Sequence, residues 1–107
     1  MTSRRRPIIW SPEARADLLR IWKFYVDAAS RKTANNVVRR IHEACRVLED
    51  YPLAGRARDK VRAGLRSVVA SPHVVFYRVT DVGPEIVRVV DGRQDLDEVF
   101  APRPGKR

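Results

Sequence analysis

The spacing of apolar residues changes abruptly at Tyr51-Pro52, and this change limits the folds that the chain can adopt. Before it, apolar residues recur every three or four positions over two segments, as on the buried face of an α-helix. After it, apolar and polar residues alternate in short segments rich in Val, Ile, Phe, Tyr and Thr, as in half-buried β-strands. A chain of 107 residues, 44% of them hydrophobic, has room for one domain with one core. We therefore expect helices first and a sheet second.

Two helices are expected in the first half of the chain. The first covers residues 12–28, because Ser11 can cap it and Pro12 suits a first turn, where no backbone N–H is needed. Its apolar stripe consists of Ala14, Leu18, Ile21, Trp22 and Tyr25. Asp17 is assigned to the polar surface of this helix. The second helix covers residues 31–50, and the short connector between the two predicts an antiparallel hairpin.

Strands are expected in the second half of the chain. The predicted segments are an early edge strand at 8–10, then strands at 65–70, 73–80 and 85–91, and a last helical turn at 95–100. In the last strand, alternation places Ile86, Arg88 and Val90 on one face. The predicted fold class is α+β: an N-terminal antiparallel helical hairpin packed on a small antiparallel β-sheet of three to four strands, with a short C-terminal helical turn. Helices then cover one face of the sheet, so we expect the second face to bind a partner.

The positive charge is concentrated at the two ends. The chain has 22 basic and 13 acidic residues, for a net charge of +9. Residues 1–6 and 103–107 hold three basic residues each and no acid, and they are predicted to be disordered basic tails on a single domain at 7–102. Such tails can also steer a protein toward nucleic acid or an acidic partner, an effect that salt weakens.

Several function classes are excluded by composition and motifs. One cysteine, Cys45, permits no intramolecular disulfide and is expected to be a buried thiol. His42 and His73 lack the neighbours of a recognised ligand set, so no metal and no cofactor are expected. No segment approaches the roughly 18 apolar residues that span a bilayer. The chain is therefore predicted to be cytoplasmic, with no membrane partner.

Arginines are the residues that stand out as candidates for a site. They lie before, on and after the predicted strands, together with one lysine: Arg56, Arg58, Lys60, Arg62, Arg66, Arg78, Arg88 and Arg93. In an antiparallel meander, Arg66, Tyr77 or Arg78, and Arg93 are expected to converge near one end of the sheet. Three interpretations stay open: a solvated basic face, a docking surface for an acidic partner, or a phosphate-contacting, ribonucleolytic cleft.

Six short motifs follow one another in the chain: Ser11-Pro12-Glu13-Ala14-x-x-Asp17-Leu18, Ile21-Trp22-x-x-Tyr25, Pro52-x-x-Gly55-Arg56, Gly64-Leu65-Arg66, Phe76-Tyr77-Arg78-Val79 and Arg88-Val89-Val90-Asp91-Gly92-Arg93-x-Asp95. With these motifs the chain resembles the ParE branch of the RelE/ParE toxins over residues 9–100. The resemblance implies the toxin of a bacterial type II toxin–antitoxin module, which inhibits DNA gyrase and is neutralised in a hetero-oligomer by an acidic, ParD-like antitoxin.

The resemblance also indicates which residues bind. No catalytic residue is expected, and the residues expected to bind antitoxin or target are Arg56, Arg58, Arg62, Arg66, Tyr77, Arg78, Arg93 and Asp95. RelE-like members cleave mRNA on the ribosome, and in that alternative Arg66, Tyr77 and Arg93 contact the scissile phosphate. A basic nucleic-acid-binding module is the remaining alternative. Many relatives carry His where this chain has Asp91, and a carboxylate there points away from ribonuclease activity unless burial raises its pKa.

Overall fold

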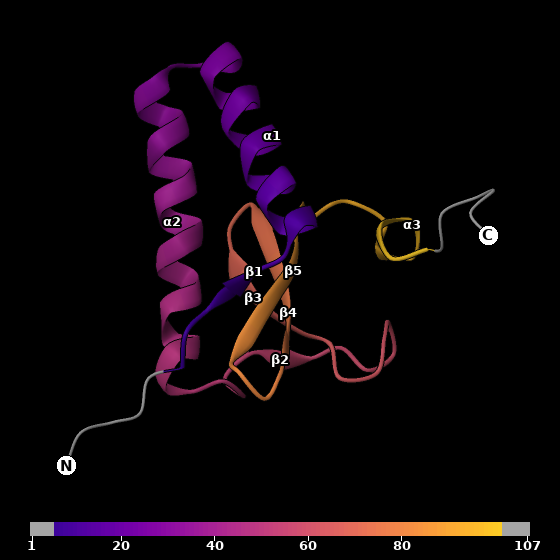
Figure 1. Cartoon of the computed structure of the whole chain (residues 1–107). Coiled ribbons are helices and arrows are strands. Elements are labelled where there is room, and N and C mark those ends of the chain that lie inside the picture. Colours follow the sequence, from indigo (N-terminus) through magenta and orange to yellow (C-terminus); the bar gives the residue numbers. More distant parts are fainter. Residues whose placement is uncertain (1–5, 102–107) are drawn as a thin grey trace.

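The structure is a computed structural model and describes residues 6–101. Two helices, α1 (Pro12–Ala28) and α2 (Arg31–Asp50), form an antiparallel hairpin beside a five-stranded sheet (Figure 1). The remaining elements are β1 (Ile9–Trp10), β2 (Arg56–Ala57), β3 (Arg66–Ala70), β4 (His73–Val79), β5 (Pro84–Asp91) and the short helix α3 (Leu96–Val99). The predicted α+β architecture is confirmed, and both long helices begin and end where the sequence placed them.

The predicted basic tails fall outside the described residues, apart from Arg6. Its backbone N–H donates a hydrogen bond of 3.0 Å to the carbonyl oxygen of Glu49, at the end of α2. Within residues 6–101, no helix is long and apolar enough to cross a membrane.

The sheet has the strand order β1-β5-β4-β3-β2. Its centre, β3-β4-β5, is the predicted antiparallel meander. The expected edge strand β1 pairs in parallel with β5, with Ile9 opposite Glu85, and β2 adds a further edge beside β3. The sheet therefore has five strands where three to four were expected. Two residues are too few to show a hydrophobic period, so β2 left no signal in the sequence.

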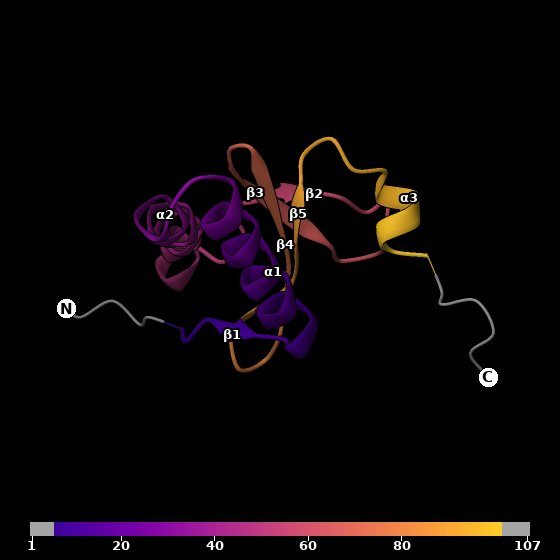
Figure 2. The same cartoon turned by 90° about the horizontal axis from the view of Figure 1, so that it is seen from above.

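Each face of the sheet carries its own apolar cluster. The main core, between the sheet and the hairpin, consists of Ala14, Val37, Ile41, Cys45, Leu48, Val75, Tyr77, Ile86 and Val89. The second-face cluster consists of Leu65, Phe76 and Val90, against which α3 packs. Figure 2 shows the hairpin on one side of the sheet and α3 on the other. Burial of Cys45 in the main core raises the pKa of its thiol to about 12.

A β-bulge in β5 shifts the alternation of its side chains. Phe76 lies opposite Arg88 and Tyr77 lies opposite Ile86, which leaves Val87 as an extra residue. The predicted single face for Ile86, Arg88 and Val90 is therefore wrong: Ile86 belongs to the main core and Val90 to the second-face cluster. Bulges change the direction of neighbouring side chains, and here Arg88 meets α1 at the edge of β5.

Asp17 is the residue of α1 that meets Arg88. It was assigned to the polar surface, but its side chain is only 2% exposed. Its Oδ2 accepts hydrogen bonds of 2.8 Å from Arg88 Nε and from the Val89 backbone N–H, and its Oδ1 accepts one of 3.1 Å from Arg88 Nη2. Arg20 also pairs with this carboxylate. The assignment was wrong because helical periodicity cannot show that a strand edge supplies partners for a buried carboxylate.

Ser11 completes the contact between α1 and β5. Its N–H donates to the Ile86 carbonyl oxygen at 3.0 Å, and its Oγ donates to the Val87 carbonyl oxygen at 3.2 Å. The same Oγ accepts the Ala14 N–H at 3.0 Å, as expected of an N-cap. Because β1 covers only the start of β5, Ser11 and Asp17 satisfy backbone groups that an open sheet edge would expose.

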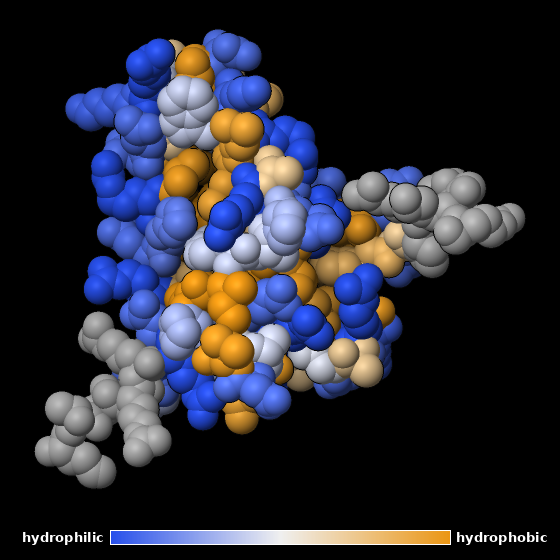
Figure 3. All heavy atoms as spheres, in the orientation of Figure 1, coloured by the Kyte–Doolittle hydropathy of each residue, from blue (hydrophilic) through white to orange (hydrophobic). Residues whose placement is uncertain are grey.

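The far half of the hairpin extends beyond the sheet (Figure 1). Phe24, in the second half of α1, is 62% exposed, and Leu19, near the middle of this helix, is 53% exposed. In Figure 3, apolar residues on this side of the molecule are broken up by hydrophilic ones. The end of α1 near the sheet and the core residues of α2 therefore hold the hairpin in place.

Replacing Asp17 with alanine is expected to destabilise the protein strongly. The change removes the partner of Arg88 and leaves the Val89 N–H unpaired, and breaking a buried ion pair of this kind costs about 3 kcal/mol. Urea-induced unfolding measures the loss. Asp27→Ala, on the exposed end of α1, is the matched control and should change stability by less than about 0.5 kcal/mol. Equal stability of the two variants would contradict the role of Asp17.

Candidate functional site

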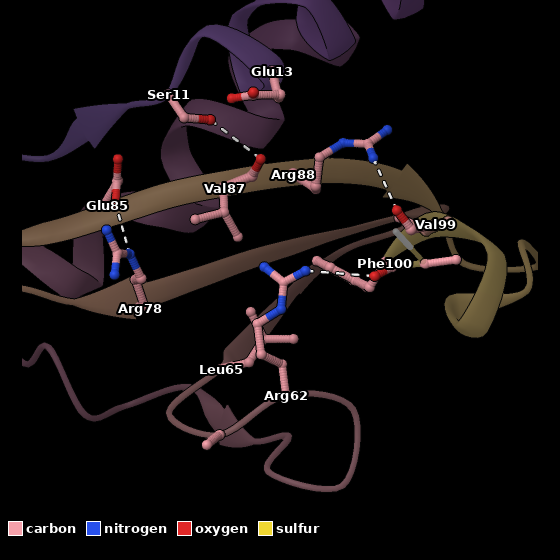
Figure 4. A pocket seen from close by; sticks show the side chains of 12 residues that line it. Ser11, Glu13, Arg62, Leu65, Arg78, Glu85, Val87, Arg88, Val99 and Phe100 are labelled. Atoms are coloured by element: carbon pink, nitrogen blue, oxygen red, sulfur yellow. Dashed lines mark hydrogen bonds and ion pairs between the residues drawn. The ribbon is translucent and has the colours of Figure 1, made fainter. Parts of the chain in front are cut away.

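A groove of about 450 Å³ lies at the edge of β5 and over the second face of the sheet (Figure 4). We call it the basic groove, and its polar lining comes from Ser11, Glu13, Arg62, Arg78, Glu85 and Arg88. Its apolar lining comes from Leu65, Val87, Val99 and Phe100, together with Ala63 and Ala101. An apolar floor with charged groups around it suits a side chain or short segment that is both apolar and charged.

The three arginines of the basic groove differ in how they are bound. Arg88 is held by Asp17, and the hydrogen bonds to that carboxylate raise the pKa of its guanidinium. Arg78 pairs with Glu85 at 2.8 Å, but its side chain is 61% exposed. Arg62 is exposed and donates to the Phe100 carbonyl oxygen at 3.5 Å. Arg62 and Arg78 can therefore bind an external carboxylate, whereas Arg88 is already occupied.

Other predicted site residues are not among those that line the groove. Arg58 donates to Ser67 Oγ at 2.9 Å, and its guanidinium carbon lies 5.8 Å from the centre of the Phe76 ring. Arg56 is exposed on the edge strand β2. Asp95 caps α3 by accepting the Asp97 N–H at 2.9 Å.

Tyr77 is completely buried and is bound to the connector between α2 and β2. Its hydroxyl donates to the Pro52 carbonyl oxygen at 2.7 Å and accepts the Gly55 N–H at 2.8 Å. A Cβ at Gly55 would lie 2.5 Å from the Tyr77 ring, so this approach requires glycine. Arg66 holds the same connector by donating to the carbonyl oxygens of Gly55 at 2.8 Å and Leu53 at 3.2 Å. Burial raises the pKa of the Tyr77 hydroxyl.

Arg93 lies far from these two residues along the sheet. Arg66 is opposite Tyr77, whereas Asp91 is opposite His73 at the other end of β4. The predicted convergence of Arg66, Tyr77 and Arg93 is therefore wrong, because β5 runs antiparallel to β4 and ends beside the start of β4.

Asp91 and Arg93 form a local pair at that end. The Arg93 N–H donates to Asp91 Oδ1 at 2.8 Å, and its guanidinium donates to both carboxylate oxygens at 3.1 and 3.2 Å. These hydrogen bonds lower the pKa of Asp91 to about 2. Asp91 is thus an anion that partly neutralises Arg93, because these hydrogen bonds lower its pKa by more than burial raises it.

His73 is buried beside this pair, and sequence analysis assigned it no role beyond excluding a metal site. Its Nδ1 has no hydrogen-bond partner among the described residues, and its ring centre lies 6.2 Å from that of Tyr25. Burial lowers the pKa of His73; the Asp91 carboxylate opposes this shift and Arg40 adds to it.

Residues 8–96 match the family model described as ParE toxin of type II toxin-antitoxin system, parDE. The chain belongs to the ParE toxin family. The resemblance seen in the six motifs is thereby confirmed.

Individual ParE relatives match over most of their length. Toxin ParE1 of Mycobacterium tuberculosis is 38% identical over 88 residues, which cover 81% of this chain and 90% of the relative. Toxin ParE1 of Caulobacter vibrioides is 33% identical over 85 residues, covering 79% and 88%. A solved chain of the chromosomal ParDE TA system from P. aeruginosa is 25% identical and superposes with a TM-score of 0.71, covering 83% of this chain and 98% of that one.

Of the predicted binding residues, Arg62 and Arg78 line the basic groove of this ParE chain. Sequence analysis missed Ser11, Glu13, Glu85 and Val87 as lining residues, and it grouped Arg88 with the arginines without separating its role. The Ser-Pro-Glu start of α1 was interpreted as a helix signal and as part of a family motif, and not as the lining of a groove. Its position beside β5 depends on pairing between distant segments, which no local pattern reveals.

Replacing Tyr77 with phenylalanine is expected to reduce the free energy of unfolding. No catalytic step is expected to depend on the Tyr77 hydroxyl. The change leaves the Gly55 N–H and the Pro52 carbonyl without their partner, at a cost of about 1–3 kcal/mol. Urea unfolding measures this loss, and Tyr51→Phe, at a tyrosine that is 67% exposed, is the matched control. A Tyr77→Phe variant with unchanged stability but abolished toxicity would instead assign Tyr77 a direct functional role.

Stability is expected to fall as the pH decreases from 7 to 5, because of His73. Its pKa is lower in the folded state than in the unfolded state, so the unfolded chain binds more protons below about pH 6.5. Urea unfolding at several pH values measures the slope. His73→Gln should flatten it. An unchanged slope in His73→Gln would contradict this assignment.

Proposed function

We propose that this ParE-family chain inhibits DNA gyrase by binding it, without catalysing a reaction, and that a ParD-like antitoxin neutralises it. The proposal that the chain catalyses no reaction rests on one observation: the three residues expected to form a ribonuclease site lie apart. Arg66 and Tyr77 are bound to the backbone of a connector, and Arg93 lies at the opposite end of β4 beside Asp91. No general acid and base face one phosphate in this arrangement. The choice of gyrase as target rests on membership in the ParE family.

The basic groove supports an acidic antitoxin as the partner. It lies on the sheet face that the hairpin leaves uncovered, and Arg62 and Arg78 present exposed guanidinium groups beside an apolar floor. Guanidinium groups bind carboxylates through paired, charge-assisted hydrogen bonds. The matching solved structure comes from a system titled ParDE. We place antitoxin and toxin in one cytoplasmic hetero-oligomer, with Arg56, Arg58, Arg93 and Asp95 as further contact residues outside the groove.

A supercoiling assay with purified gyrase tests the proposed target. Stoichiometric toxin is expected to block supercoiling of relaxed plasmid, and prior addition of the antitoxin should restore it. A parallel incubation with ribosomes and mRNA should leave the mRNA intact. Normal supercoiling at excess toxin, or cleavage of the mRNA, would contradict the proposal.

The antitoxin interface is tested by removing one exposed charge from the groove. Arg78→Gln is expected to lower the association rate constant roughly 2- to 5-fold at low salt, because charges at the rim of an interface steer association. The effect should shrink at high salt. Arg46→Gln, on the outer surface of α2, removes the same charge away from the groove. Surface plasmon resonance measures both variants, and equal rates would contradict docking in the groove.

A further inference from the structure

The short helix α3 lines one end of the basic groove and packs on the second-face cluster beside it. It spans only Leu96–Val99, and none of its residues is buried. Leu96, Val99 and Phe100 stand at helical spacing i, i+3 and i+4, and they pack against the second-face cluster. Figure 4 shows Val99 and Phe100 at one end of the groove, facing Arg88 and Arg62. The chain thus supplies an apolar helical turn to its own candidate binding surface.

Two arginines of the groove bind the end of α3. Arg88 Nη1 donates to the Val99 carbonyl oxygen at 3.3 Å, and Arg62 Nη2 donates to that of Phe100 at 3.5 Å. The Arg62 guanidinium carbon also lies 5.0 Å from the centre of the Phe100 ring, which meets Phe76 edge to face at 5.1 Å. These contacts place the negative end of a helix against positive charge.

The attachment of α3 is weak by its chemistry. Helices much shorter than about 12 residues are marginal in water, so α3 depends on its contacts with the sheet. Its two hydrogen bonds to arginine are long, and their acceptors are neutral carbonyl groups. A carboxylate in place of the Phe100 carbonyl would form an ion pair with the exposed Arg62 guanidinium, with short N–H···O bonds of about 2.7–2.9 Å. An acidic segment can therefore replace α3 at this site.

We propose that α3 with Phe100 is an internal placeholder that the antitoxin displaces. The displacing segment is an amphipathic helix with apolar side chains at i, i+3 and i+4 over Leu65, Phe76 and Val90, and with a carboxylate at Arg62. This inference rests on the proposed neutralisation by an antitoxin and specifies the chemistry of that partner. The placeholder also lowers the apparent affinity for the antitoxin. A segment that can bind only when α3 is detached has its affinity reduced in proportion to the fraction of molecules in which α3 is detached.

Weakening the placeholder in the full-length protein tests the inference. Phe100→Ala removes the contacts with Phe76 and Arg62, and it is expected to tighten binding of the antitoxin encoded by the neighbouring reading frame roughly 3- to 10-fold. Phe24→Ala, at an exposed phenylalanine of α1, is the matched control and should leave the affinity unchanged. Isothermal titration calorimetry measures both. Weaker or unchanged binding by Phe100→Ala would overturn the inference.

Hydrogen exchange of the unmodified protein gives a second readout that needs no variant. The Val99 and Phe100 amides bond to the carbonyl oxygens of Asp95 and Leu96. On binding antitoxin they are expected to exchange faster, while the strand amides beneath the groove exchange more slowly. A complex in which the α3 amides become more protected would overturn displacement while leaving the proposed function intact. Absence of any complex would overturn both.

Discussion

The carboxylate of Asp17 is the interaction on which the rest of the structure depends. It joins α1 to β5 by accepting the Val89 N–H, and it fixes the Arg88 guanidinium with two further bonds. One side chain thus satisfies a backbone N–H of β5 in the part of this strand that β1 does not reach, and it attaches α1 to the sheet there. It also decides which way Arg88 points, and Arg88 in turn reaches α3. The bulge at Val87 is needed as well, because it brings Arg88 to this edge.

The basic residues divide into those that hold the fold and those that face a partner. Arg66 is bound to the connector between α2 and β2, and Arg88 is bound to Asp17. Their guanidinium groups therefore have partners inside the domain. Arg62 and Arg78 keep exposed guanidinium groups at the basic groove. Composition alone cannot make this distinction, since both kinds of arginine contribute equally to the net charge. The division explains how a modestly basic domain can present one surface suited to carboxylates.

The sequence predicted the long elements well because their periodicity is local. Ser11-Pro12 and the Tyr51-Pro52 pair marked helix ends correctly, and Val-rich segments marked the meander. It did not predict the burial of Asp17, the bulge at Val87 or the position of Arg93, because each depends on pairing between segments far apart in the chain. The candidate site was predicted less completely than the fold. Arg62 and Arg78 were predicted to bind a partner, but the residues of α1 that line the groove were not.

The central claim is that the hairpin covers one face of the sheet and leaves the basic groove for the antitoxin. Methyl NMR of the isotope-labelled toxin tests it directly. On addition of antitoxin, the methyl groups of Leu65 and Val87, which line the groove, are predicted to shift most. Those of Leu19 and Val47, exposed on the helices, should shift little. Large shifts at Leu19 and Val47 with Leu65 and Val87 unchanged would contradict the account.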